Sequence, residues 1–444
     1  MLVSLLAALV AAAPAAPAAT KAFPFPIEVH ALPNGLRVAL VQYDSPGLVA
    51  YYTLMRVGSR NEVEKGRSGY AHFFEHMMFR GTRQHPARDY NDTVTRLGLN
   101  TNAFTSEDMT VYHLYGPAKA LPTIIEYEAD RFQNLDYDEP AFRTEAGAIL
   151  GEYVKSASNP EQKLYEKMME TAFTRHTYAH TVIGYLKDIE NMPSGYQYSR
   201  EFFRRYYTPD DAIIFVAGDF DRSSTLQAID KAYGSWKGKA DPVKVPQEPR
   251  QHQSKRAQVS WDKPTLPRLW IAWHTPGASD IKSAAVQNLL NAYLFGPTSP
   301  LYQNLVLGKQ LVDSMEPTYS DHRDPNLFGV LLRVKDAKNL KAVEHAILLE
   351  IKSLAGGKLD PKRFEAVRSN LRYSNIMGLD TADAAALSEA VNAALTGDVN
   401  YLNKEFDALA QLQPKDLQNF AKSHFIDLNR TTVTLTSASK GGAR

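Results

Sequence analysis

The sequence predicts an α+β protein built from two homologous halves, and three observations predict this class. The chain has 444 residues, which is more than one hydrophobic core normally serves. A polar stretch with three prolines at 237–256 divides the chain near its middle and has the character of a linker. A faint repeat places a similar order of strands and helices on both sides of this linker, so we expect two domains of about 200 residues each.

The composition limits which partners and which metal ligands are expected. Lys and Arg total 50 against 49 Asp and Glu, without blocks of one sign, so the charge does not favour nucleic-acid binding. The apolar fraction of 44% is that of a globular protein. Cysteine is absent, and a metal ion would therefore need His, Asp or Glu as ligands.

Residues 1–22 have a short apolar run followed by alanines and prolines. This pattern predicts a signal peptide with a cleavage region such as Ala16-Pro17-Ala18, and the run is too short to span a bilayer. No Lys or Arg precedes the apolar run, so a disordered arm is the alternative. A signal peptide implies a periplasmic or secreted protein, whereas an arm is compatible with the cytoplasm.

The first half is expected at 23–236. VHALPNGLRVALVQYD (29–44) predicts a hairpin around Pro-Asn-Gly at 33–35, and LVAYYTLMRVGS (48–59) predicts another strand. Helical patterns then alternate with strands. DDAIIFVAGDFD (210–221) is continuously apolar at its centre and predicts a buried strand that closes this half.

The second half is expected at 257–444. It begins with the strand-like QVSWDKPTLPRLWIAWHTP (258–276) and ends with LNRTTVTLTSA (428–438), which is placed like the closing strand of the first half. LDYDEPAFRTEAGAILGEY (135–153) and LDPKRFEAVRSNLRYSNI (359–376) share Leu-Asp, a proline that opens a helix, and a following Phe. These similarities support a duplicated unit.

The stretch GYAHFFEHMMFRGT (69–82) predicts a partly buried helix with three polar groups close together, His72, Glu75 and His76. Residues four apart lie on one face of a helix, so both imidazoles can reach one cation. Glu75 borders the same face. A hydrolytic zinc site needs three protein ligands and an open position, and the third ligand must come from another segment.

Glu152 is the candidate for the third ligand. The second helix starts at Asp138-Glu139-Pro140, and its residues Glu145 and Glu152 are seven apart and share a stripe. Two carboxylates beside apolar residues are unfavourable to bury without a partner, which a cation would supply. Taken singly, the histidines could be core residues and the glutamates a solvated face. His-x-x-Glu-His followed 76 positions later by Glu152 favours a metal site instead.

The repeat gives the second half no equivalent site. Matching positions across the two halves places Gln287, Leu290 and Asn291 near the positions of His72, Glu75 and His76 in the first half, and Ser374 at the position of Glu152. None of these four has an imidazole or a carboxylate. We therefore expect one metal site per chain, in the first half.

These motifs resemble the pitrilysin/insulinase family of zinc metallopeptidases, in its mitochondrial-processing-peptidase-like subgroup. LGLNTNAFTSEDMTVYHLYGP (97–117), HTYAHTVIG (176–184) and YYTPDDAIIFVAGDFD (206–221) fit the same family pattern. The resemblance implies that each half is an α/β sandwich with a mixed sheet and helices packed on one face. It also implies that the two joined halves form half of a clamshell.

The resemblance also implies the roles of the site residues. His72, His76 and Glu152 would bind one Zn²⁺ ion, and Glu75 would be the general base that activates a zinc-bound water. Glu145 would be an accessory carboxylate needed for activity.

The segment Asn102, Ala103, Phe104 and Thr105 resembles the exposed sheet edge that binds substrate in the family. An unfolded peptide would pair with it as an added strand through main-chain hydrogen bonds. The structural alternative is an ordinary edge strand.

The chain departs from the family pattern in its second half. Members that work alone or as identical pairs carry an arginine and a tyrosine seven apart that contact substrate, and here those positions fall on Val306 and Asp313. Neither residue can donate a hydrogen bond to a developing oxyanion. We therefore expect a heterodimer in which a homologous partner without the zinc motif supplies Arg and Tyr. The alternatives are a self-sufficient homodimeric peptidase and a non-catalytic structural relative. No nucleic-acid partner or stable membrane insertion is expected.

Overall fold

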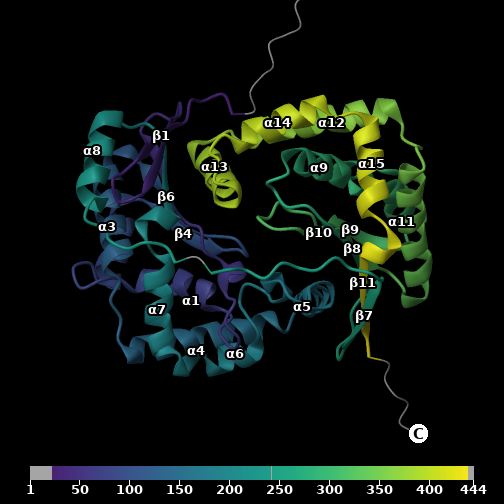
Figure 1. Cartoon of the computed structure of the whole chain (residues 1–444), viewed down its shortest axis with the longest axis horizontal. Coiled ribbons are helices and arrows are strands. Elements are labelled where there is room, and N and C mark those ends of the chain that lie inside the picture. Colours follow the sequence, from purple (N-terminus) through teal and green to yellow (C-terminus); the bar gives the residue numbers. More distant parts are fainter. Residues whose placement is uncertain (1–22, 242, 439–444) are drawn as a thin grey trace, which may run out of the picture.

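The computed structural model describes residues 23–241 and 243–438, and the predicted signal peptide or arm at 1–22 lies outside them. Over these residues the chain forms two mixed β-sheets and their covering helices (Figure 1). The predicted α+β class is confirmed. None of the helices described is both long enough and apolar enough to span a bilayer.

The first sheet carries the predicted hairpin and the buried closing strand. Its strands are β1 (Glu28–Ala31), β2 (Arg37–Gln42), β3 (Leu48–Met55), β4 (Asn100–Thr105), β5 (Thr110–Pro117) and β6 (Ala212–Gly218). Their spatial order is β1-β2-β6-β3-β5-β4, with β2 and β6 parallel and the other pairs antiparallel. β6 is buried at every position, which explains its continuous apolar sequence. β4 pairs with β5 and forms one edge of the sheet.

The second sheet repeats this order without a counterpart of β1. Its strands are β7 (Lys255–Trp261), β8 (Arg268–Thr275), β9 (Val312–Pro317), β10 (Asn326–Val334) and β11 (Arg430–Ser437). The spatial order is β7-β11-β8-β10-β9, with β7 and β11 parallel. β11 therefore holds the place that β6 holds in the first sheet, as the repeat predicted. β7 begins inside the segment expected to be a linker.

Helices lie on both sides of each sheet. Those of the first half are α1 (Tyr70–Met77), α2 (Ala87–Leu97), α3 (Leu121–Asn134), α4 (Glu139–Ser156), α5 (Pro160–Ala172), α6 (Leu186–Asn191), α7 (Tyr196–Tyr206) and α8 (Arg222–Tyr233). Those of the second half are α9 (Ile281–Phe295), α10 (Pro300–Tyr302), α11 (Leu340–Ala355), α12 (Pro361–Met377), α13 (Ala382–Thr396), α14 (Tyr401–Gln411) and α15 (Pro414–His424). One face of each sheet packs on helices from its own half.

The opposite face of each sheet is covered by a helix from the other half. Alanines of α13, including Ala390 and Ala394, pack against Tyr52 and Phe215 of the first sheet. Conversely, Leu164 and Met168 of α5 belong to the core of the second sheet with Trp270 and Val433. Figure 1 shows α13 reaching across to the strands of the first half. The prediction of helices on one face of each sheet holds for the helices of the same half. It did not include the helix that each half contributes to the other half's sheet, and these two helices join the halves through two apolar cores.

The segment between the sheets is held in place by hydrogen bonds. The carboxylate of Glu248 accepts bonds from the backbone N–H groups of Thr174, Arg175 and His176 at 2.9–3.0 Å. A chain that is anchored in this way does not act as a free tether between the halves.

Candidate metal centre and active site

α1 presents its apolar side to the core and its polar side to the second helix of the site. Phe73 and Phe74 are fully buried, which agrees with the partly buried helix predicted for this stretch. The remaining face carries His72, Glu75 and His76 of the His-x-x-Glu-His motif. His72 is buried, whereas the other two are partly exposed.

The start of α1 is fixed by a residue that the sequence did not reveal. Buried Glu62 accepts hydrogen bonds from the backbone N–H groups of Gly69 at 2.8 Å and Ala71 at 2.7 Å. Burial raises the pKa of Glu62 to about 8, although these N–H groups oppose the rise. Gly69 has φ 94°, and a Cβ there would lie 2.6 Å from the carbonyl oxygen of Ile183. Glu62 and Gly69 therefore set the position from which His72 and His76 project.

α4 brings the two predicted carboxylates to α1. The Asp138 side chain accepts a hydrogen bond from the N–H of Ala141 at 2.8 Å, so the helix begins where its sequence predicted. The rings of Phe73 and Phe142 lie 5.0 Å apart and pack the two helices together. Glu145 is buried and Glu152 is partly exposed on the side that faces α1.

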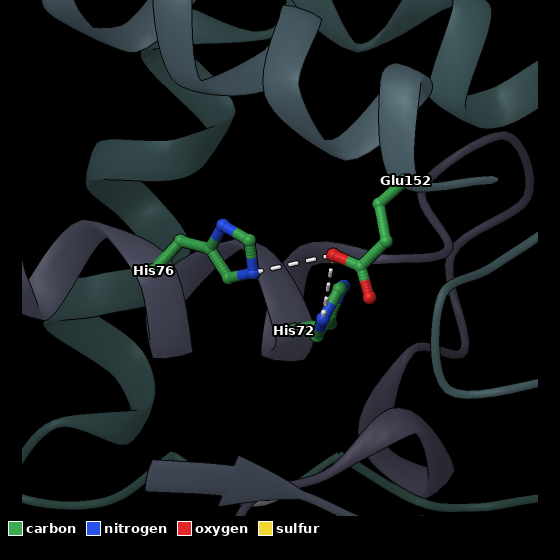
Figure 2. A group of neighbouring side chains, drawn as sticks. All are labelled: His72, His76 and Glu152. Atoms are coloured by element: carbon green, nitrogen blue, oxygen red, sulfur yellow. Dashed lines mark ion pairs between the residues drawn. The ribbon is translucent and has the colours of Figure 1, made fainter. Parts of the chain in front are cut away.

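His72, His76 and Glu152 converge in space. Oε2 of Glu152 lies 3.7 Å from Nε2 of His72 and 3.5 Å from Nε2 of His76 (Figure 2). One ligating atom from each residue lies within 4.8 Å of the other two. A tetrahedral ion with bonds of about 2.1 Å separates its ligands by about 3.4 Å, so both carboxylate–imidazole distances suit such an ion. Burial lowers the pKa of His72 to about 4, which leaves a neutral imidazole. Two imidazoles and a carboxylate are a donor set suited to Zn²⁺.

Glu145 lies behind the cluster and fixes the orientation of His76. Its carboxylate is 2.9 Å from Nδ1 of His76 and also accepts a hydrogen bond from Arg80. Burial alone would raise the pKa of Glu145, but the bonds from His76 and Arg80 outweigh it and lower the pKa. An ionised carboxylate only accepts, so Nδ1 of His76 carries the proton and Nε2 is the atom that faces Glu152. The role of Arg80 was not predicted from the sequence.

Glu75 sits between the cluster and the edge strand. Its carboxylate accepts a hydrogen bond of 2.6 Å from the hydroxyl of Thr105. Burial raises the pKa of Glu75, and the bond from Thr105 opposes this. A cavity of about 430 Å³ opens beside it, and its lining residues are Glu75, His76, Phe79, Arg80, Ala87, Asn91 and Glu145. The cavity leaves open space beside the Glu75 carboxylate.

The predicted edge segment forms β4, and the structure brings its end to Glu75. Asn102 is exposed, Ala103 is buried and Phe104 is half-buried. The N–H of Ser106 bonds to the carbonyl of Met109 at 2.8 Å, and antiparallel hydrogen bonds recur at every second residue. In this register Asn102 and Phe104 bond to β5. The backbone groups of Ala103 and Thr105 therefore point away from the sheet.

The second half has other groups at the matching positions. Val306 lies half-buried in the π-helical turn Gln303–Gly308, and Asp313 on β9 pairs with Arg333. Gln287 on α9 is fully buried and donates to the carbonyl of Pro276 at 3.2 Å. Among the residues described, His72, His76 and Glu152 are the one group of His, Asp or Glu close enough to hold an ion.

Comparison with known families gives matches to both halves. Residues 38–185 match the model described as insulinase (peptidase family M16). Residues 196–371 match the model described as the peptidase M16 inactive domain. The first match includes α1 and α4, which carry the clustered side chains.

Individual proteins with similar sequences are also named as peptidases. The zinc protease PqqE of Helicobacter pylori is 27% identical over 410 residues, covering 91% of each chain. The probable mitochondrial-processing peptidase subunit beta of Arabidopsis thaliana is 25% identical over 365 residues, covering 79% of this chain and 67% of that protein.

Solved structures share the whole fold. A protease from Helicobacter pylori superposes with a TM-score of 0.87 at 26% identity, covering 93% of this chain and 99% of that one. The periplasmic protease PqqL of Escherichia coli has a TM-score of 0.75 at 17% identity, and the match covers 93% of this chain but 48% of PqqL. With both halves matched and its sequence and structural relatives named as proteases, this chain belongs to the insulinase family of peptidases, family M16.

Proposed function

We propose that this chain is the zinc-bearing subunit of an endopeptidase that hydrolyses unfolded peptides. The observation that carries the proposal is the convergence of His72, His76 and Glu152 from two separate helices. Such convergence places two imidazoles beside a carboxylate in a partly buried site, which is the environment of a catalytic zinc ion with one open position. The zinc proteases among its relatives support the choice of metal.

The neighbouring residues have distinct roles in this proposal. When bound, zinc polarises the scissile carbonyl and makes water more acidic. Glu75 accepts the proton of the attacking water and returns it to the leaving amine, a contribution of about 10²–10⁴ in rate. Glu145 holds Nδ1–H of His76 and keeps Nε2 directed at the ion, and Arg80 holds Glu145 in turn.

β4 binds the substrate. The outward N–H and C=O groups of Ala103 and Thr105 pair with an extended peptide as with a neighbouring strand. Thr105 joins this edge to Glu75, so a peptide bound there passes the general base. Main-chain pairing requires an unfolded substrate and tolerates many side chains.

A partner subunit completes the active site. Val306 and Asp313 cannot stabilise an oxyanion, and the side chain of Asp313 is paired with Arg333. We assign the missing donors to a homologous chain. The name "subunit beta" of a relative supports pairing, as does PqqL, a chain about twice as long as the part that this chain matches. The predicted signal peptide at 1–22 and the periplasmic description of PqqL support a periplasmic or secreted enzyme.

The test compares Glu75→Gln with His76→Ala in the complex purified from its native source. Glu75→Gln is expected to retain one zinc per chain and to lose hydrolysis of an unstructured peptide by at least about 10²-fold. His76→Ala is expected to lose both zinc and activity, because it removes a ligand. Zinc is measured by elemental mass spectrometry and hydrolysis with a quenched fluorescent peptide. A wild-type complex without stoichiometric zinc would support a non-catalytic relative instead.

A further inference from the structure

The turn Ser106–Met109 between β4 and β5 determines where Thr105 meets Glu75. Thr105 is the last residue of β4 and donates to Glu75, and the next residue bonds across the turn to Met109 at 2.8 Å. A shift of this turn therefore moves the hydroxyl that holds the Glu75 carboxylate.

Within the first half, the helical turn η1 (Ser59–Asn61) packs against the turn Ser106–Met109. The N–H of Arg60 donates to the carbonyl of Glu107 at 2.8 Å, and the N–H of Ser59 donates to the carbonyl of Ser106 at 3.3 Å. The approach is close, since a Cβ on Gly58 would lie 2.4 Å from the Ser106 oxygen. These bonds link the turn to Arg60, whose side chain points to the second half.

The loop 320–324 of the second half contacts the same turn from the other side. The N–H of Arg323 donates to the carboxylate of Asp108 at 3.1 Å, and Nε2 of His322 lies 3.6 Å from Glu107. Asp324 accepts a hydrogen bond from the guanidinium of Arg60 at 2.5 Å and is 2.9 Å from Nε2 of His176. The contacts thus join three segments of the first half to one loop of the second.

The buried and partly buried charged groups at this contact between the halves stabilise one another. Asp108 is 1% exposed and accepts hydrogen bonds from the hydroxyl of Tyr178 at 2.7 Å and from the backbone of Arg323. Burial alone would raise the pKa of Asp324, but His176 and Arg60 hold it well below its usual range. Removing the charge of Asp324 would leave the partly buried Arg60 without its closest acid, with Asp108 next at 3.8 Å.

We propose that loop 320–324 is a positioning element for catalysis, in which Asp324 acts through Arg60 and the Ser106–Met109 turn to hold Thr105 against Glu75. The inference rests on the proposed role of Glu75 as general base. It gives the second half, which has no metal-ligating cluster among its described residues, a direct part in the reaction of the first half.

The first test is amide hydrogen exchange on Asp324→Asn in the purified native complex. Exchange at residues 105–109 is expected to accelerate by at least about 10-fold, while the zinc content stays unchanged. Asp427→Asn is the matched control, because Asp427 also pairs with an arginine, Arg430, but that pair lies within the second half and Asp427 is 83% exposed. His322→Gln gives a milder second variant if Asp324→Asn does not fold. Unchanged exchange at 105–109 in the folded variants would overturn the proposal.

The second test is a double-mutant cycle on kcat/KM with Thr105→Val. If Asp324 acts through Thr105, each single variant loses about 10-fold, and the double variant loses little more than either one. If the losses multiply, Asp324 acts on stability or binding independently, and the inference is wrong. An inactive wild-type complex would instead contradict the proposed function itself, so the two failures are distinct.

Discussion

At the scale of single residues, the geometry of the proposed ligands depends on groups that are not ligands themselves. Glu145 accepts the Nδ1–H of His76, and Arg80 neutralises part of its charge. Glu62 plays a similar part for the helix as a whole, since it binds the first backbone N–H groups of α1. The ligand geometry is therefore set by carboxylates on two sides of the motif.

Glu145→Gln is expected to weaken zinc binding by about 10- to 100-fold, because an amide is a weaker acceptor for the Nδ1–H of His76. Competition with a chelator of known affinity measures the change. Glu139→Gln is the control on the same helix, where Glu139 pairs with Arg143 on the surface. Equal zinc affinity in the two variants would show that Glu145 does not orient the ligand.

At the scale of elements, the outer edge of β4 pairs with no other strand among residues 23–241 and 243–438. Its outward backbone groups alternate along the strand with those bonded to β5. A peptide bound at this edge would therefore use the backbone N–H and C=O groups of every second residue. Binding by side chains in a pocket would show no such two-residue period, so the period distinguishes the two modes of binding.

N-methylation of the substrate tests strand pairing without altering the protein. A series of peptides, each methylated at one amide near the cleaved bond, is expected to show KM raised by about 10-fold or more at every second position. Methyl groups at the intervening amides, which point away from β4, should leave KM nearly unchanged. A uniform response along the peptide would contradict binding as an added strand.

The elements also show what the sequence could and could not predict. Four-residue spacing put His72 and His76 on one helix face, because that contact is local. Glu152 was predictable through its stripe with Glu145 and the spacing of a known motif. Arg80, Glu62 and the loop 320–324 were missed because their partners are set by tertiary packing between distant segments.

The exchange of helices was likewise invisible in the sequence. α13 is rich in alanine, and nothing in its periodicity says which sheet it covers. Its small side chains let it approach the first sheet closely, as the buried Ala386, Ala390 and Ala393 show. The order of strands, by contrast, could be predicted because the repeat preserved it.

At the scale of the whole molecule, the halves are joined by apolar cores and by an ionic contact. Burial alone would raise the pKa of Glu107, but the ion pair with His322 at 3.6 Å and the hydrogen bond from Tyr165 lower it to about 2. Burial alone would lower the pKa of His322, but Glu107 raises it to about 9. The pair therefore stabilises the junction most strongly between pH values of about 4.5 and 6.5, the ordinary pKa values of the two groups.

Stability is expected to fall as the pH rises from 6.5 through 9, because His322 then loses the proton that the folded state favours. The loss should be about 3 kcal/mol in the free energy of unfolding, since the pKa of His322 rises from 6.5 to about 9 on folding and each pKa unit corresponds to about 1.4 kcal/mol. Urea unfolding across this range measures it, with His322→Gln for comparison. Parallel pH profiles for the two proteins would show that this contact contributes nothing.

The purified chain alone is expected to hydrolyse an unstructured peptide at least about 10²-fold more slowly than the native complex, because oxyanion donors come from the partner. Zinc content should be equal in both samples, so that the difference is not one of metal loading. Full activity from the chain alone would establish a self-sufficient peptidase, and size-exclusion chromatography would then decide between a monomer and a homodimer.

Binding of zinc by His72, His76 and Glu152 can be tested directly by anomalous scattering at the zinc edge from crystals grown with zinc. We expect one strong peak per chain, at about 2.0–2.2 Å from Nε2 of His72, Nε2 of His76 and a carboxylate oxygen of Glu152. Zinc bound at other residues, or no peak in this position at saturating zinc, would contradict this prediction.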